Sequence, residues 1–81
     1  MATLPTANDT ALLILETLVE DLMLRPDQYV QDQALKLAFE KRGGHRTDIP
    51  AGLKHATEQE WLRYDSDKDT FFLTEAGFTQ A

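Results

Sequence analysis

The sequence contains no cysteine, which excludes a disulfide bond and any thiolate ligand for a metal ion. It also lacks a long apolar run. The longest, Ala11 to Leu15, is far shorter than the ~20 residues that a membrane-spanning helix needs. No basic residue precedes this run, so the pattern of a secretory signal is missing as well. These absences predict a cytoplasmic protein without a membrane segment.

Signatures of catalysis and of metal binding are missing too. The sequence has no glycine-rich phosphate-binding loop and no pairing of a nucleophile with a base, and 81 residues leave little room for a large pocket. His45 and His55 lie ten residues apart, which is not a zinc-ligand spacing. We therefore expect no enzyme, no metal site and no cofactor.

Asp65, Asp67 and Asp69 match the opening of an EF-hand calcium loop in their alternate spacing. That loop requires glycine at its sixth position and glutamate at its twelfth, where this chain has Thr70 and Ala76. The three aspartates therefore predict an acidic hairpin turn instead of a calcium site.

Basic residues are scarce, and the net charge is −6. Nucleic-acid-binding proteins are usually basic, because contacts to phosphate supply much of their affinity. The basic residues are nevertheless concentrated: residues 36–57 hold five bases and two acids. The average charge thus argues against DNA binding, whereas the local excess of positive charge leaves it open.

A chain of this length forms one domain at most. Residues 1–8 include Pro5 and show no periodicity, so we expect a loose lead-in before a domain of residues 9–81. A domain of this size buries roughly 60–65% of its unfolded surface, so almost every large apolar residue is needed in the core.

The first helix is expected to begin at a cap formed by Asn8 or Asp9 and to run to about Leu24. Its apolar stripe comprises Leu12, Leu15, Leu18, Val19 and Leu22. Leu13, Met23 and Leu24 fall off that stripe. Such a surplus indicates a homodimer formed through this helix, although scattered exposed apolar residues are also common.

Tyr29-Val30 is a short extended piece that is expected to form a third strand. Asp32 then caps a second helix over residues 33–42. Its buried face comprises Leu35, Ala38 and Phe39. Gly43 stands where a left-handed residue ends a helix. A tight turn follows, as in a helix-turn-helix.

The third helix is capped by Thr47 or Asp48, with Pro50 in its first turn. Two strands follow, at 62–65 and 70–73. The turn between them is Ser66-Asp67-Lys68-Asp69, and Thr74 caps a short closing turn or helix. The pattern predicts an α+β fold that is mostly helical, with three main helices, a two- or three-stranded wing sheet and this C-terminal turn or helix.

Residues 9–77 resemble the winged helix-turn-helix superfamily, most clearly from residue 53 onward. The matching residues are Leu53, Ala56, Gln59, Glu60, Trp61, Leu62, Leu73, Thr74, Glu75, Ala76 and Gly77. Glu60 stands where glycine is typical, which puts the geometry at the end of the third helix in question. The resemblance implies a small regulatory domain and indicates no single family.

In a helix-turn-helix, the start of the second helix reads base edges while flanking bases hold phosphates. The resemblance therefore implies contact with double-stranded DNA and a role in transcription regulation. The candidate DNA-binding residues are Lys41, Arg42, His45, Arg46, Lys54 and His55. Lys41 and Arg42 are the expected phosphate contacts. Solvated surface is the alternative for all six.

An acidic protein-interaction module on the same scaffold, without DNA binding, is the alternative function. Asp65 and the wing turn that follows it carry three aspartates against one lysine, and such a group repels phosphate. A basic protein would be the partner. The candidate protein-interaction residues are Leu13, Met23, Leu24, Asp65, Asp67 and Asp69.

Three aromatic residues complete the predictions. Trp61, at the junction of helix and strand, is expected to be largely buried. Phe71 and Phe72 lie on opposite faces of their strand. Packing between strands is the favoured interpretation of this pair, and a stacking platform for single-stranded nucleic acid is the alternative.

Overall fold

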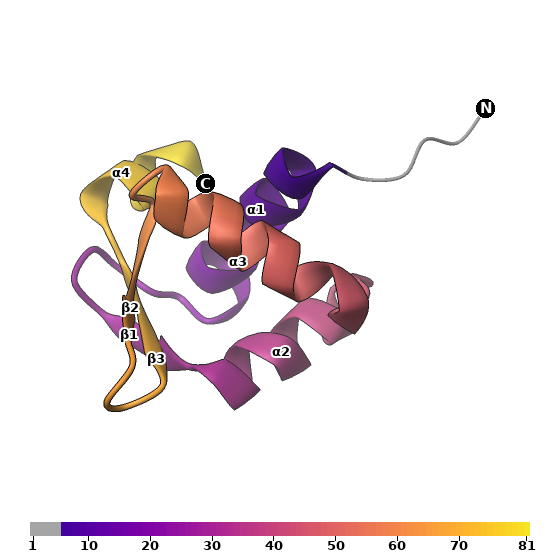
Figure 1. Ribbon diagram of the computed structural model, residues 1–81, viewed down its shortest axis with the longest axis horizontal. Coiled ribbons are helices and arrows are strands. Elements are labelled where there is room, and N and C mark those ends of the chain that lie inside the picture. The colour runs from indigo at the N-terminus through magenta and orange to yellow at the C-terminus, as the bar shows by residue number, and fades with distance from the viewer. Residues whose placement is uncertain (1–5) are drawn as a thin grey trace.

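The wing sheet lies at one end of the molecule and three helices pack at the other (Figure 1). A computed structural model describes residues 6–81. The helical segments are α1 (Ala7–Glu16), the π-helical η1 (Thr17–Asp21), α2 (Asp32–Lys41), the 3-10 turn η2 (Arg46–Asp48), α3 (Ile49–Glu58) and α4 (Glu75–Gln80). The strands are β1 (Tyr29–Gln31), β2 (Leu62–Asp65) and β3 (Thr70–Leu73). The predicted α+β winged helix-turn-helix arrangement is confirmed.

Helix α1 begins two residues before the predicted domain boundary. The Thr6 side chain accepts a hydrogen bond from the Asp9 amide at 3.1 Å, and the Thr6 amide donates to the Asp9 carboxylate at 3.2 Å. This reciprocal pair is a capping box, so Thr6 is the cap and Asp9 is the third helical residue. The prediction of Asn8 or Asp9 as the cap was therefore wrong. Residues 1–5 of the predicted lead-in lie outside the described residues.

The buried face of α1 is displaced from the predicted stripe. Its core residues are Ala11, Ile14, Leu15 and, in η1, Leu18, whereas Leu12, Val19 and Leu22 are partly buried. This face packs against α3. Gly52 makes the approach possible, because a Cβ atom there would lie 2.5 Å from Thr10 Cγ2.

The helical segment ends at Asp21 instead of Leu24. The Leu24 amide donates to the Leu18 carbonyl at 2.9 Å, and Met23 between them has a φ of 56°. This bond spans one residue more than the 6→1 bond of a Schellman motif, at a place where the helix ends in a π turn, and Met23 holds the left-handed position that glycine usually takes after a helix. The reversal buries Leu24 in the core and leaves Met23 68% exposed.

Leu24 therefore does not belong to a protein-interaction surface, and that assignment was wrong. Leu13 is partly buried against the core, so Met23 is the one exposed member of the predicted apolar surplus. A homodimer through the first helix stays a prediction, with less apolar surface to support it.

The turn between α2 and α3 is anchored in the core. Gly43 has a φ of 97°, as predicted for a left-handed residue after a helix. Gly44 lies so close to the Phe39 ring that a Cβ atom would collide with it. The 3-10 turn η2 then leads into α3, whose first turn contains Pro50. The tight turn therefore depends on one glycine for its backbone conformation and on the other for its packing.

Strand β3 is the centre of the antiparallel sheet, with β1 and β2 on either side. The predicted third strand is confirmed, since Tyr29 pairs with Phe72 and Val30 with Phe71. Phe71 is buried, and its ring centroid lies 4.8 Å from that of Tyr64. Phe72 is on the opposite face, 5.7 Å from the ring of Tyr29. The aromatic pair thus packs between strands, as favoured.

The exit of α3 keeps its geometry although glutamate replaces glycine. Glu60 has a φ of 61°, and the Trp61 amide donates to the Ala56 carbonyl at 2.9 Å. Contrary to the prediction, Trp61 is only partly buried. The chain reverses here, and the indole lies at the rim of the core with its ring edge-on to that of His55 at 5.7 Å.

Candidate functional site

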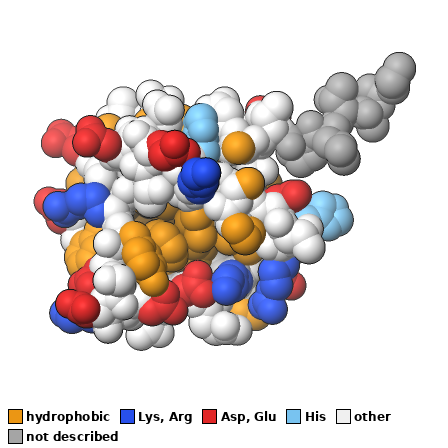
Figure 2. Space-filling model, in the orientation of Figure 1, with side chains coloured by type: hydrophobic (Ala, Val, Ile, Leu, Met, Phe, Trp, Pro, Cys, Tyr) orange, Lys and Arg blue, Asp and Glu red, His pale blue; other side chains and the backbone are white. Residues whose placement is uncertain are grey.

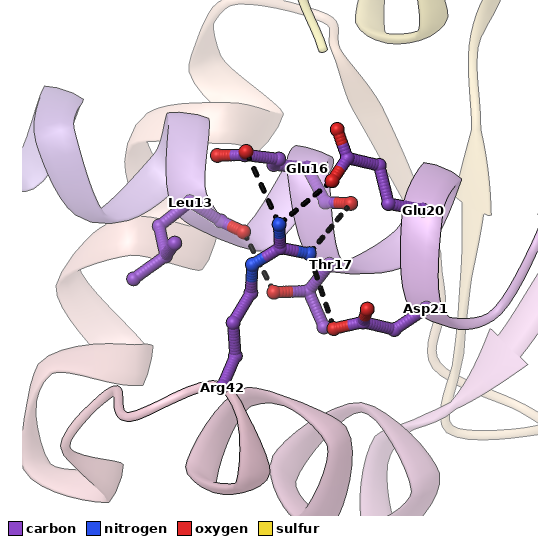
Figure 3. A network of polar contacts seen from close by, with 6 residues as sticks. All are labelled: Leu13, Glu16, Thr17, Glu20, Asp21 and Arg42. Atoms are coloured by element: carbon purple, nitrogen blue, oxygen red, sulfur yellow. Dashed lines mark hydrogen bonds and ion pairs between the residues drawn. The ribbon is translucent and has the colours of Figure 1, made fainter.

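Arg42, which follows α2, reaches across to α1 and η1 and binds three carboxylates (Figure 3). One terminal nitrogen donates to Glu16 at 3.1 Å and to Glu20 at 2.7 Å, and the other donates to Asp21 at 3.1 Å. Only 22% of the Arg42 side chain is exposed. The hydrogen bond to Glu20 is the largest cause that raises the Arg42 pKa above its ordinary value. This guanidinium is engaged within the domain.

The π-helical turn explains how three carboxylates reach one guanidinium. Glu16 and Glu20 are four residues apart and lie on the same face of a regular helix. Asp21 is one residue further along and would project to the side of that face. A π turn closes i→i+5 hydrogen bonds, so it brings the fifth residue nearer to the first. No pattern in the sequence predicted this π-helical turn.

Arg42→Met is expected to lower the melting temperature at low salt, because the three carboxylates would lose the cation that offsets their mutual repulsion. The loss should shrink at high salt, which screens exposed charges. Thermal melting followed by circular dichroism at both salt concentrations measures the effect. Arg46→Met is the matched control, since it removes one exposed ion pair and should change little. Equal melting of the two variants would refute a role for the network in holding α2 on α1.

Two more of the predicted DNA-binding residues also have partners within the domain. Arg46 Nε donates to Glu40 Oε1 at 2.6 Å, and both side chains are exposed. His55 Nε2 lies 3.1 Å from Asn8 Oδ1, and its ring is packed against Trp61. The Arg46 and His55 side chains are therefore both engaged within the domain.

Lys41, His45 and Lys54 are exposed and form no ion pair within residues 6–81. Lys36 is paired with Asp32 at 2.7 Å. The positive segment that the sequence indicated is thus largely neutralised by carboxylates from the same domain. Contact between DNA and these three residues stays a prediction.

The acidic wing turn is ordered by its own carboxylates. The Asp65 carboxylate accepts a hydrogen bond from the Asp67 amide at 3.0 Å. Tyr64 donates its hydroxyl to Asp69 Oδ1 at 2.7 Å, and this bond is the main cause that raises the Tyr64 pKa above its ordinary value. Asp69 itself has a left-handed φ of 51°. Asp67 and Lys68 are exposed at the tip.

A hollow lies between α3 and the wing. Apolar side chains gather at the centre of this face, between α3, α2 and the strands (Figure 2). The hollow has a volume of about 400 Å³ and is lined by Leu53, Lys54, Thr57, Tyr64, Phe71, Asp32 and Asp69. Its floor is the half-buried Leu53 and the buried Phe71, and its wall is the 49% exposed Tyr64. Asp32 and Asp69 stand at its edge.

A second hollow, of about 800 Å³, adjoins the first at Tyr64 and Thr57. The two share Tyr64 and Thr57, and the second is bordered by Asp27, Glu60 and Glu75. Five carboxylates and two basic side chains line the pair of hollows together. The resulting groove is apolar at its floor and acidic at its rim.

Among the predicted site residues, only Lys54 and Asp69 line this groove. Sequence reasoning missed Leu53, Tyr64 and Phe71 as a group. The available signal was the alternation along the hairpin, which puts Tyr64 opposite Phe71. Nothing in the sequence specified how α3 lies against that pair.

Residues 6–81 contain no helix that is long and apolar enough to cross a membrane. The same residues contain no group of three or more histidines and carboxylates able to hold a metal ion. No family model, curated protein or solved structure matches the chain.

Proposed function

We propose that this winged-helix domain is a protein-interaction module that docks a basic segment of another protein. The observation that carries the proposal is the internal pairing of Arg42 with three carboxylates and of Arg46 with Glu40, which leaves fewer bases of the helix-turn-helix segment free to contact phosphate. Phosphate contacts supply most non-specific DNA affinity, so a domain with few available bases binds DNA weakly.

Overall charge supports the same proposal. The net charge is −6, and Asp65, Asp67 and Asp69 lie at the wing, where a DNA-binding wing would carry bases. Surfaces of one sign attract partners of the other and speed their encounter. A basic protein partner thus meets a favourable field where a nucleic acid meets repulsion. The absence of cysteine supports a cytoplasmic location for this interaction.

The test compares two labelled probes by fluorescence anisotropy at low salt, where electrostatic attraction is greatest. One is a short mixed-sequence DNA duplex. The other is an amphipathic peptide of about four helical turns, built from leucine, alanine and arginine. We expect the peptide to bind with a Kd below ~1 mM and the duplex to show no such affinity.

Binding of the duplex below ~1 mM, with chemical-shift changes at Lys41, His45 and Lys54, would replace the proposal with the DNA-binding function. Charge reversal at Lys54 would then weaken that binding. If the peptide binds and the duplex does not, protein interaction is supported.

A further inference from the structure

The groove between α3 and the wing has a composition that selects one kind of protein segment. Its floor is made by Leu53 and Phe71, and the exposed Tyr64 lines both of its hollows. Five carboxylates border it, and only Asp32 and Asp27 have a basic partner within residues 6–81. Glu60, Glu75 and Asp69 form no ion pair with a basic side chain in that part of the chain.

Tyr64 and Asp69 together make a receptor for a guanidinium group. The 2.7 Å hydrogen bond from the Tyr64 hydroxyl fixes the ring relative to the Asp69 carboxylate. The ring also packs on Phe71 at 4.8 Å between centroids, so one aromatic face is supported and the side chain remains 49% exposed. The hydrogen bond occupies only part of the acceptor capacity of the carboxylate, which has about four lone-pair sites.

We infer that the groove docks an arginine-containing amphipathic segment of a protein partner. An arginine of that segment stacks its guanidinium on Tyr64 and pairs with Asp69, while a neighbouring aliphatic side chain covers Leu53 and Phe71. Planar guanidinium groups stack on aromatic rings and pair with carboxylates, which ammonium groups do less well. This inference rests on the proposed function and names the site and partner chemistry for it.

Arginine specificity and an apolar anchor distinguish this site from general attraction to an acidic protein. The leucine, alanine and arginine peptide is therefore compared with a scrambled peptide of the same composition that has no apolar face. A third peptide carries lysine in place of every arginine. We expect the scrambled and lysine peptides to bind at least about tenfold and threefold more weakly, respectively.

Amide chemical-shift mapping locates the site on the intact chain. We expect the largest shifts at Leu53, Thr57, Tyr64, Asp69 and Phe71 when the amphipathic peptide is added. Equal binding of the original and scrambled peptides would overturn the inference. So would shifts confined to other surfaces, although peptide binding there would leave the proposed function intact. Binding of duplex DNA alone would overturn both.

Matched variants test the two receptor groups. Asp69→Asn removes one charge and suits the left-handed backbone, which asparagine tolerates well. Asp67→Asn makes the same charge change in the same turn at a residue that does not line the groove. We expect the first to weaken peptide binding about threefold to tenfold and the second less than about twofold. Equal effects would show that only overall charge matters.

Tyr64→Leu keeps an apolar cover over Phe71 and removes the aromatic face. We expect about threefold to tenfold weaker binding of the arginine peptide and little change for the lysine peptide. Dispersion of the amide spectrum reports folding of each variant. A folded Tyr64→Leu protein that binds the arginine peptide like the parent would contradict the stacking contact.

Discussion

Phe39→Ala is expected to lower the free energy of unfolding by about 3–5 kcal/mol, the usual cost of removing a fully buried phenylalanine. Phe39 is 1% exposed in the core, and its ring also supports the close approach of Gly44 in the turn before α3. Its loss would leave a cavity and release that turn. Urea denaturation followed by circular dichroism measures the change.

Leu37→Ala is the matched control, because Leu37 lies on the same helix and is 52% exposed. Both changes introduce alanine into α2, and the gain in helix propensity is below ~0.7 kcal/mol in each. We expect Leu37→Ala to change the free energy of unfolding by no more than ~0.5 kcal/mol. Similar losses in the two variants would show that Phe39 is not a core residue.

Gly77→Ala is expected to lower the free energy of unfolding by about 3 kcal/mol. A Cβ atom at Gly77 would collide with the carbonyl oxygen of Trp61, which is backbone and can't rotate away. Helix propensity alone predicts the opposite sign, because alanine is favoured over glycine in a helix by ~1 kcal/mol. The sign of the measured change therefore reports the contact between α4 and the start of β2.

Gly43→Ala is the comparison, because Gly43 has room for a Cβ atom but a left-handed backbone conformation. Gly43 has a φ of 97° and no atom within 4 Å of a Cβ placed there. Its replacement should cost about 1–2 kcal/mol through the left-handed conformation alone. Denaturation of both variants in urea ranks the two costs. If Gly77→Ala proved as stable as the parent, α4 would have to lie further from Trp61.

The regular parts of the fold were predictable because local chemistry specifies them. The strands at 62–65 and 70–73 flank a polar turn, the second is rich in aromatic residues that favour strands, and the structure has both at those positions. Thr74 caps α4 as predicted, accepting a hydrogen bond from the Gly77 amide. Gly43 likewise has the backbone that its place after a helix indicated.

The irregular parts were not predictable, because residue type gave the wrong signal or none. Met23 and Glu60 hold left-handed positions that usually belong to glycine. The first reverses the chain and buries Leu24, which sequence reasoning had placed on the surface. Tertiary packing overrode the local preference of both residues.

The candidate site likewise has features that the sequence predicted and features that it did not. The local excess of positive charge at 36–57 was visible in the sequence, but the pairing of Arg42 depends on carboxylates far away in the chain. Arg42 meets Glu16, which lies 26 residues earlier. Lining residues of the groove likewise come from separate elements, Leu53 from α3 and Tyr64 from β2. Such groupings follow from packing, which a single sequence does not reveal.

The position of β3 in the sheet also determines when the fold can be completed during synthesis. β1 pairs with β3, so Val30 can pair with Phe71 only after about 40 more residues have been synthesised. At ~5–20 residues per second, a ribosome needs about 2–8 s to make that stretch. Helices form within microseconds, so α1, α2 and α3 can form well before their sheet. During those seconds β1 has no partner strand, and the apolar faces of the helices lack their cover from β3.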